Sequence, residues 1–262
     1  MTTSESLMRA STPRHWDDYW KKQDDLDDAY SNEDRLIDGL LRLMDPKGKK
    51  ILEVGGGSGR DSIRLAQMGA EVTVIDYVES SLGVVARNAE RAGVKITLVH
   101  GDALKMPFPD NTFDAVFHQG LMEHFRDEQP LLLENRRVLK PGGLVLIDVP
   151  QKYHIYTLFK QTLIAMNRWF AGWETQYSID ELESIVRKAG FEVAGRYGDW
   201  MCPGFFYRLA RRGLSTTGLA KLPKYPRVPP FAQINDAWRG AWRRTPVAIY
   251  TYAMIGAVGR KV

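Results

Sequence analysis

The residues of this chain best suited to chemistry lie around three alternating glycines, Gly55, Gly57 and Gly59. Glycine adopts positive φ and lets the backbone approach a ligand closely, and a glycine turn between a strand and a helix directs N–H groups at that ligand. The acidic residue Glu53 stands two positions before the first glycine. Its carboxylate would repel the pyrophosphate of a dinucleotide and attract a cation or an amino group. The turn therefore favours an amino acid-like ligand with a positive centre over NAD.

Two further acids follow apolar segments that predict strands. Residues 72–76 predict a strand that ends in Asp76, and residues 96–99 predict another ahead of Gly101 and Asp102. An acid about 20 residues beyond a glycine turn suits the two hydroxyls of a ribose, because a carboxylate offers two oxygens. The glycines and acids together indicate a site for a nucleoside that carries a positive charge.

Five segments, in order, resemble the landmarks of class I S-adenosylmethionine-dependent methyltransferases. A single G-x-G-x-G motif would be weak evidence, whereas five landmarks in register are specific. The resemblance covers about residues 33–199 and is closest to the type 11, ubiquinone/menaquinone methyltransferase-like branch. The landmarks are the E/D-x-G-x-G-x-G motif at 53–59, the acid Asp76, the segment 101–103, the fourth strand at 113–117 and the turn into the fifth strand at 139–146.

The resemblance implies a role for each residue around the glycine turn. Glu53 is expected near the methionine ammonium, Asp76 at both ribose hydroxyls, and Asp102 at the adenine amino group. Ala103 is expected to give a backbone N–H to the adenine ring. The full set of expected S-adenosylmethionine-binding residues is Glu53, Gly55, Gly56, Gly57, Asp76, Tyr77, Asp102, Ala103 and Gln119.

Two histidines follow the fourth predicted strand. His118 stands where that strand ends, and imidazole titrates near neutrality, so His118 is the candidate catalytic residue, a general base for an oxygen or nitrogen nucleophile. The alternative is that His118 only borders the pocket. His124 resembles a packing histidine of the family. No metal is expected, because the sequence has no Cys/His cluster with ligand spacing.

The alternation of strand and helix patterns predicts an α/β fold, a doubly wound, seven-stranded, mostly parallel sheet of the Rossmann-like methyltransferase kind with helical and aromatic substrate-cap insertions. The ligand then belongs at the carboxyl ends of the strands. The sixth strand is expected to start at residues 191–193 and the last one to span 247–252. Helices are expected after a cap at Asn32, at 60–68, 80–92 and 131–139, and after the capping box of Ser178 and Glu181.

Four parts are expected along the chain. Residues 1–32 form an N-terminal arm whose first 14 residues look disordered, and 33–199 form the cofactor-binding core with a cap segment at 152–176. Residues 200–245 form a basic, aromatic insertion, and 246–262 contribute the final strand.

Aromatic and long apolar side chains gather in the arm and the cap segment. They are expected to form a lid and an acceptor cavity, and ordinary core packing is the alternative for each of them. The lid candidates are Trp16, Tyr19 and Trp20, and the cavity candidates are Phe159, Met166, Trp169 and Phe170.

Composition limits the class of protein. A chain of 262 residues with 44% hydrophobic residues suffices for one α/β domain with insertions. The single cysteine excludes an internal disulfide framework, and the sequence lacks a signal-peptide core and a spanning apolar run, so a cytoplasmic location is expected. The net charge is +4, yet residues 200–262 hold 11 Lys/Arg against one Asp. This excess indicates an anionic partner or a merely solvated basic face.

The expected reaction is an SN2 methyl transfer to a small acceptor, with the protein binding and orienting the reactants. Apolar caps and a basic, Trp-rich C-terminal region favour a lipophilic or aromatic acceptor, met at an anionic membrane surface by peripheral contact. A nucleic-acid methyltransferase is the second hypothesis, although residues 117–120 do not resemble an N-P-P-Y motif. A non-catalytic S-adenosylmethionine-binding scaffold is the third, and the presence of Glu53, Asp76 and Asp102 argues against it.

Overall fold

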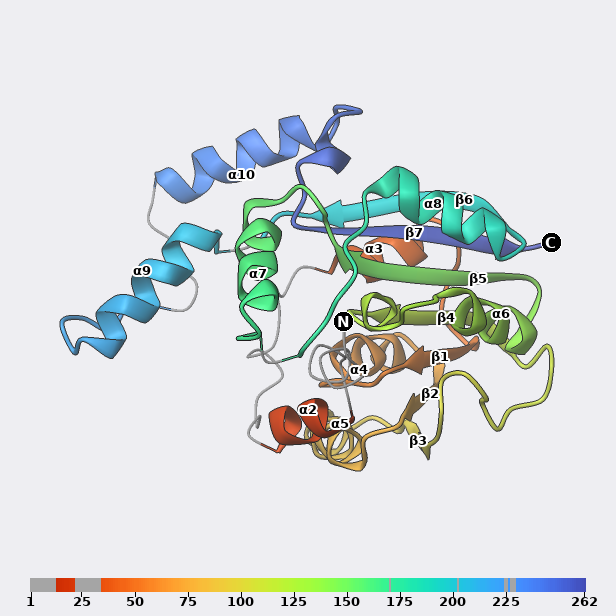
Figure 1. Cartoon of the computed structure of the whole chain (residues 1–262). Helices are drawn as coiled ribbons and strands as arrows, with labels where there is room; N and C mark the ends of the chain where they lie inside the picture. The colour runs from red at the N-terminus through yellow and green to blue at the C-terminus, as the bar shows by residue number, and fades with distance from the viewer. Residues whose placement is uncertain (1–12, 22–33, 170, 202, 224–225, 227–229) are drawn as a thin grey trace.

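In the described part of the chain, seven strands form one sheet in the order β3-β2-β1-β4-β5-β7-β6 (Figure 1). This computed structural model describes residues 13–21, 34–169, 171–201, 203–223, 226 and 230–262. The strands β1 to β5 run parallel, and β7 pairs antiparallel with both β5 and β6. The predicted doubly wound, mostly parallel sheet is therefore confirmed. The strands are β1 (Lys50–Val54), β2 (Glu71–Asp76), β3 (Thr97–His100), β4 (Phe113–Gln119), β5 (Leu139–Pro150), β6 (Phe191–Asp199) and β7 (Met254–Lys261).

Helices cover both faces of the sheet. The helices α3, α4 and α5 pack on one face, and α6 and α8 pack on the other. Helix α2 lies against α5, whereas α7, α9 and α10 gather beyond one end of the strands (Figure 1). No helix in the described part of the chain has the length and apolar character needed to cross a membrane. The helices are α2 (Pro13–Trp20), α3 (Arg35–Leu41), α4 (Arg60–Gln67), α5 (Glu79–Ala92), η1 (Met122–His124), α6 (Gln129–Val138), α7 (Ile155–Ala165), α8 (Ile179–Lys188), α9 (Phe205–Thr216), α10 (Phe231–Trp242) and η2 (Ala248–Tyr250).

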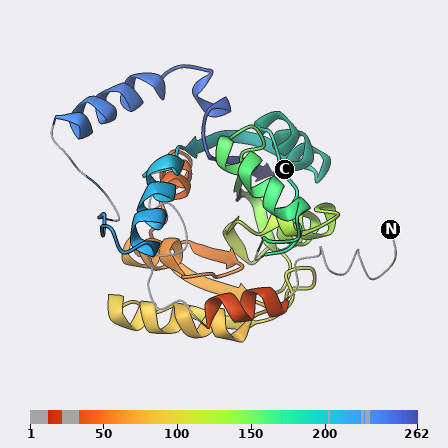
Figure 2. The same ribbon diagram turned by 60° about the vertical axis from the view of Figure 1, so that its left-hand side comes forward.

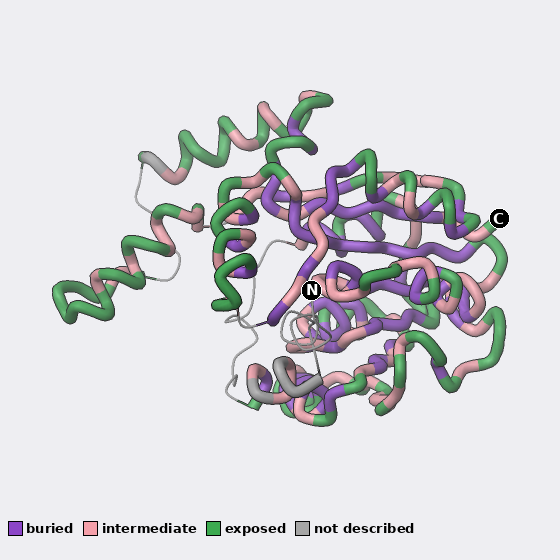
Figure 3. Tube along the Cα trace, in the orientation of Figure 1, coloured by how far each residue is buried: buried purple, intermediate pink, exposed green. Residues whose placement is uncertain are grey.

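A hydrophobic core lies on each face of the sheet, because successive strand residues point to opposite sides. On β4, Val116 belongs to the core that also contains Leu131 and Leu182 of α6 and α8. The next residue, Phe117, belongs to the opposite core with Leu36 of α3. Burial on both faces explains why the central strands are continuous apolar runs (Figure 3).

The predicted helices of the core match the structure closely at their ends. The segments expected at 60–68 and 80–92 are α4 and α5, and α6 begins two residues earlier than expected. The capping box holds α8, since Ser178 accepts from the Glu181 N–H and the Glu181 side chain accepts from the Ser178 N–H. Asn32 and residues 1–12 lie outside the described residues.

The position expected for the last strand was wrong. Residues 247–252 are rich in β-branched and aromatic residues, yet they contain the short helix η2, and the strand starts at Met254. The strand β7 occupies a crowded place between β5 and β6, where the ring of Tyr197 lies so close to Gly256 that a Cβ atom would be 2.1 Å away. Contacts across the sheet therefore outweigh the low strand propensity of a glycine-rich segment.

A buried ion pair fixes α3 to the sheet. Arg35 donates from Nε and Nη2 to the two carboxylate oxygens of Asp148 on β5, each at 2.8 Å. Both side chains are at least 96% buried. The fork of the guanidinium matches the carboxylate, so this contact sets the orientation of α3 against β5 as well as its position.

Candidate active site

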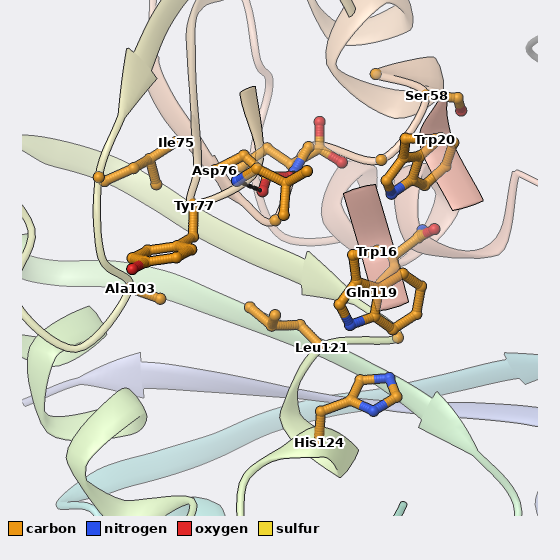
Figure 4. A pocket seen from close by; sticks show the side chains of 18 of the residues that line it. Trp16, Trp20, Ser58, Ile75, Asp76, Tyr77, Ala103, Gln119, Leu121 and His124 are labelled. Atoms are coloured by element: carbon orange, nitrogen blue, oxygen red, sulfur yellow. Dashed lines mark hydrogen bonds between the residues drawn. The ribbon is translucent and has the colours of Figure 1, made fainter. Parts of the chain in front are cut away.

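A cavity of about 470 Å³ opens at the carboxyl ends of β1, β2 and β4 (Figure 4). Parallel α/β sheets bind ligands at this edge. All nine residues expected to bind the cofactor line the cavity, and further lining comes from α2, from the start of α4 and from the segment after β4. The nine are Glu53, Gly55, Gly56, Gly57, Asp76, Tyr77, Asp102, Ala103 and Gln119.

The glycine loop is held against the end of β2. Asp76 accepts hydrogen bonds from the N–H groups of Gly56 and Val78 and from the Ser81 hydroxyl, each at 2.8 Å. Gly57 has φ +50, and a Cβ atom there would lie 3.3 Å from the ring of Trp20. The loop thus needs glycine, and Asp76 already holds it in place before any ligand is considered.

Buried carboxylates make this cavity acidic. Burial raises the pKa of Glu53, which accepts a hydrogen bond from Ser62, and burial likewise raises the pKa of Asp76 and of Asp61. A cationic ligand would stabilise the ionised forms of these groups by Coulomb attraction. The cavity therefore suits a positively charged nucleoside and disfavours a pyrophosphate.

Asp102 and Tyr77 lie toward the solvent side of the cavity. The Leu104 N–H donates to Oδ1 of Asp102 at 2.9 Å, so this carboxylate also stabilises the turn after β3. The side chain of Tyr77 is 58% exposed. Both residues remain free to contact one end of a bound molecule.

Sequence reasoning missed Asp61, which lines the cavity in the first turn of α4. Its carboxylate accepts from the amide nitrogen of Gln119 at 2.5 Å and from Arg60 at 3.2 Å. An acid just after a glycine loop, at the positive end of a helix, is a signal that could have indicated it. The contact joins the end of β4 to the start of α4 across the floor of the cavity.

The structure corrects the expected place of His118. Its side chain is fully buried, it does not line the cavity, and neither ring nitrogen has a hydrogen-bond partner among the described residues. Burial lowers the pKa of His118 to about 3. Alternation along β4 turns His118 to the same face of the sheet as Val116, into the core. A group without access to a reactant cannot take its proton, so His118 is not the general base.

His124 lines the cavity instead. It ends the short helix η1, and its ring lies edge-on to that of Trp16 with centroids 4.9 Å apart (Figure 4). Burial lowers the pKa of His124, so the imidazole is neutral at pH 7. Its Nδ1 has no hydrogen-bond partner in the described structure.

Glu123, which precedes His124 in the chain, lies near a buried polar cluster of Lys160, Trp169 and Glu174. Lys160 of α7 forms an ion pair with Glu174, and the indole N–H of Trp169 donates to the same carboxylate at 2.6 Å. Glu123 is 2% exposed and its Oε2 has no partner among the described residues. Burial, with the nearby charge of Glu174, raises the pKa of Glu123 to about 8. The described residues contain no group of three or more His, Cys, Asp or Glu that could hold a metal ion.

The aromatic residues expected to form the lid and those expected to line the acceptor cavity have different positions in the structure. Of the three lid candidates, Trp16 and Trp20 of α2 line the cavity and Tyr19 does not. The expected lining by Phe159, Met166 and Trp169 is wrong: the first two are exposed, and Trp169 packs near the Lys160 ion pair. Helix α7 buries Thr157, Lys160 and Ile164 and leaves Ile155, Leu158 and Phe159 exposed. Phe170 lies outside the described residues.

The strand order, the glycine loop and the acidic cavity define the Rossmann-like methyltransferase class of fold. A family model described as a methyltransferase domain matches residues 52–147. A demethylmenaquinone methyltransferase of Anoxybacillus flavithermus is 33% identical over 59% of this chain and 74% of its own length. A ubiquinone biosynthesis O-methyltransferase of Ruegeria pomeroyi is 31% identical over 58% of this chain and 63% of its own length. A solved structure of an S-adenosylmethionine-dependent methyltransferase from Aquifex aeolicus superposes with a TM-score of 0.58 at 18% identity, covering 94% of this chain and 98% of that one.

The chain belongs to the S-adenosylmethionine-dependent methyltransferase family. It is an enzyme of the transferase class, and its cofactor is S-adenosylmethionine. The resemblance found from the sequence motifs is confirmed.

Proposed function

We propose that this enzyme transfers the methyl group to a small, lipophilic aromatic acceptor. The observation that carries the proposal is the division of one cavity into two kinds of wall. Glu53, the glycine loop and Asp76 form an acidic, backbone-rich wall, and Trp16, Leu121 and Phe125 form an apolar one. The names of two relatives, which refer to demethylmenaquinone and to ubiquinone biosynthesis, support an aromatic acceptor.

The acidic wall is proposed to hold the cofactor. When bound, S-adenosylmethionine supplies a methyl group activated on a positively charged sulfur. Glu53 acts on the ammonium side, Asp76 on the ribose, and Asp102 with Ala103 on the adenine. The loop glycines and Gln119 complete this wall, and Tyr77 covers its outer end. The buried carboxylates favour a cation over a neutral ligand.

The apolar wall is proposed to hold the acceptor and to keep water away from it. A dry wall of Trp16, Leu121 and Phe125 would assist a transfer in which the positive charge of the bound donor is dispersed. His124 is the cavity-lining group that can take a proton from a hydroxyl or amine of the acceptor, because its imidazole is neutral at pH 7.

Each of the four segments expected along the chain has a place in the proposed function. We assign residues 1–32 to an arm whose helix α2 covers the cavity, and 33–199 to the core with the cap segment 152–176. Residues 200–245 are an insertion between β6 and the strand that closes the sheet within 246–262. Trp20, at 6% exposure over Gly57, supports the role of α2 as a lid.

An assay of labelled methyl transfer tests the acceptor. The enzyme is incubated with methyl-labelled S-adenosylmethionine and either a prenylated dihydroxyaromatic compound or transfer RNA. We expect label in the solvent-extracted lipid fraction and background label in the RNA. Label in RNA alone would overturn the proposed acceptor. Enzyme inactivated by boiling serves as the negative control.

A further inference from the structure

The described residues between 200 and 245 form a C-terminal arm, which leaves the sheet on the side where the cavity opens (Figure 1). The arm starts where β6 ends, and β7 begins opposite Pro150, at the carboxyl end of β5. Its two helices, α9 and α10, lie beyond that edge, and α10 stands clear of the sheet in both views (Figures 1 and 2). None of the residues of α9 is buried, and both helices are mostly exposed (Figure 3).

Helix α9 exposes its apolar side. Phe206, Leu209, Ala210 and Gly213 fall on one face by helical periodicity, and Phe206 and Leu209 are 66% and 53% exposed. The opposite face carries three arginines. A helix of this kind normally buries its apolar face, so α9 presents a surface suited to a partner. The arginines are Arg208, Arg211 and Arg212.

Helix α10 repeats the arrangement. Ile234, Ala237, Trp238 and Ala241 share one face, with Ile234 and Trp238 at 62% and 54% exposure. The ring of Trp238 stacks on that of Trp242 at 5.7 Å between centroids, which holds the indole at the surface. Two successive helices therefore carry exposed apolar faces.

Helix α7 extends this surface toward the body of the enzyme. Its exposed residues Ile155, Leu158 and Phe159 lie on one side of the helix. The ring of Phe205, at the start of α9, contacts Phe159 with centroids 5.4 Å apart. Apolar surface thus continues from the cap segment onto α9, along the edge at which the cavity opens.

We propose that the arm docks the enzyme on an anionic lipid bilayer through the apolar faces of α9 and α10. Residues 200–245 contain nine Lys/Arg and one acidic residue, which complements a negatively charged surface. Exposed Phe, Leu, Ile and Trp side chains insert at the boundary between headgroups and acyl chains, while arginines contact the headgroups. Docking turns the carboxyl ends of the parallel strands, where the cavity opens, toward the bilayer.

A second copy of the chain or a nucleic acid could in principle cover part of this surface. A nucleic acid would use the arginines and leave the aliphatic side chains exposed, because its contacts are dominated by phosphate charge. A second copy would have to bring the nine positive charges of one arm next to those of another. An anionic bilayer satisfies both the charge and the apolar faces.

Flotation of the full chain with vesicles tests the proposal without any acceptor. We expect binding to vesicles that contain one third phosphatidylglycerol, little binding to pure phosphatidylcholine, and weaker binding at 0.5 M NaCl. The total tryptophan fluorescence should shift to shorter wavelength on binding, because the exposed ring of Trp238 enters a less polar surrounding. Protein that stays with the vesicle-free fraction at low salt would overturn the proposal.

Variants separate the two kinds of contact. Phe206→Asp with Leu209→Asp on α9, and Ile234→Asp on α10, should each reduce binding at least ten-fold. Leu133→Asp, at a leucine 55% exposed on α6, is the matched control and should bind as wild type. Arg211→Glu with Arg212→Glu should reduce binding roughly five-fold or more for each charge. Its control is Lys47→Glu with Lys49→Glu, near the start of β1 at the opposite edge, which makes the same change in net charge.

Two outcomes besides absence of binding would overturn the proposal. One is a dimer in light scattering without lipid that the same α9 and α10 variants dissociate. The other is equal loss of binding in arm and control variants, which would show that net charge alone controls it. Neither outcome depends on which acceptor is methylated. The flotation test therefore remains valid even if the methyl-transfer assay contradicts the proposed acceptor.

Discussion

The carboxylate of Asp76 connects the end of β2 to the glycine loop. It receives three hydrogen bonds from Gly56, Val78 and Ser81, which leaves little acceptor capacity for the two ribose hydroxyls expected from the sequence. Asp76 therefore positions the loop, and we propose that its remaining acceptor capacity serves the ligand.

A comparison of substitutions at Asp76 and Ser81 tests the role of the Asp76 carboxylate in cofactor binding. Asp76→Ala should weaken S-adenosylmethionine binding by about 10- to 100-fold, since a hydrogen bond to a charged group contributes about 1.5–3 kcal/mol. Ser81→Ala is the control, because it removes one bond that holds the carboxylate and leaves the carboxylate itself. Isothermal titration should show a much smaller loss for Ser81→Ala. Unchanged affinity in Asp76→Ala would refute the assignment.

His124 is expected to set the acid limb of the rate profile. Its pKa lies below the usual value near 6.5 because it is buried, so the neutral base persists as the pH falls and kcat/KM should decline only below about pH 6.5. His124→Asn should lower kcat by about 10²- to 10⁴-fold and abolish that limb. His118→Leu should keep both rate and limb. An unchanged limb in His124→Asn would exclude His124 as the base.

The two histidines show what the sequence could and could not predict at individual positions. The cavity-lining residues were predictable because each lies at or soon after the end of a strand, and parallel strands bring their carboxyl ends together. The choice between His118 and His124 depended on which way each side chain points. His118 falls within β4, one residue before Gln119, and the exact end of a strand cannot be read from composition.

The ion pair between Arg35 and Asp148 is expected to control the docking of α3 on β5. Arg35→Met leaves a buried carboxylate without its partner and should lower the free energy of unfolding by about 3–5 kcal/mol. Arg35→Met combined with Asp148→Leu should recover most of that loss, because no uncompensated charge remains. Urea denaturation measures both. Equal destabilisation in the single and double variants would contradict this account.

Local sequence signals predicted the helices and strands of the core more accurately than the elements near the chain ends. The α8 capping box and the glycines after α4 and α5 act within one turn, so their pattern is visible in the sequence. The place of β7 depends on room beside Tyr197, and the place of α3 depends on a partner 113 residues away. Such contacts are set by the tertiary structure and have no local pattern.

The pH dependence of stability should reveal the buried cluster beside the cavity. Burial raises the pKa of Glu123 to about 8 in the folded protein from its ordinary value of 4.5, so Glu123 contributes stability that is complete below pH 4.5 and is lost as the pH rises to about 8. Glu123→Gln lacks this dependence. The unfolding free energy of wild type should fall relative to the variant by on the order of 4 kcal/mol between pH 4.5 and 8.

Urea denaturation at several pH values checks this expectation. Glu134→Gln is a suitable control, because Arg137 holds the pKa of that carboxyl below its usual value and the sign of the effect is reversed. A constant difference between wild type and Glu123→Gln across the range would contradict the buried, protonated state of Glu123.

The cavity and the helices α2, α7, α9 and α10 lie toward the carboxyl ends of the parallel strands (Figure 1). Helix α2 covers the glycine loop, η1 brings His124 into the cavity, and the apolar faces of α7, α9 and α10 continue outward from there. The opposite edge carries the short connections between helices and strands. This arrangement fits the proposed function, because a charged cofactor and a lipophilic acceptor could both bind where the cavity opens.

A crystal structure of the enzyme with S-adenosylhomocysteine is the most direct test of the central claim that this cavity holds the cofactor. We predict the adenine beside Asp102 and Ala103, the ribose at Asp76 and the amino acid portion between Glu53 and the glycine loop. A cavity that remains empty at saturating ligand, or one that binds a nicotinamide dinucleotide instead, would contradict the account.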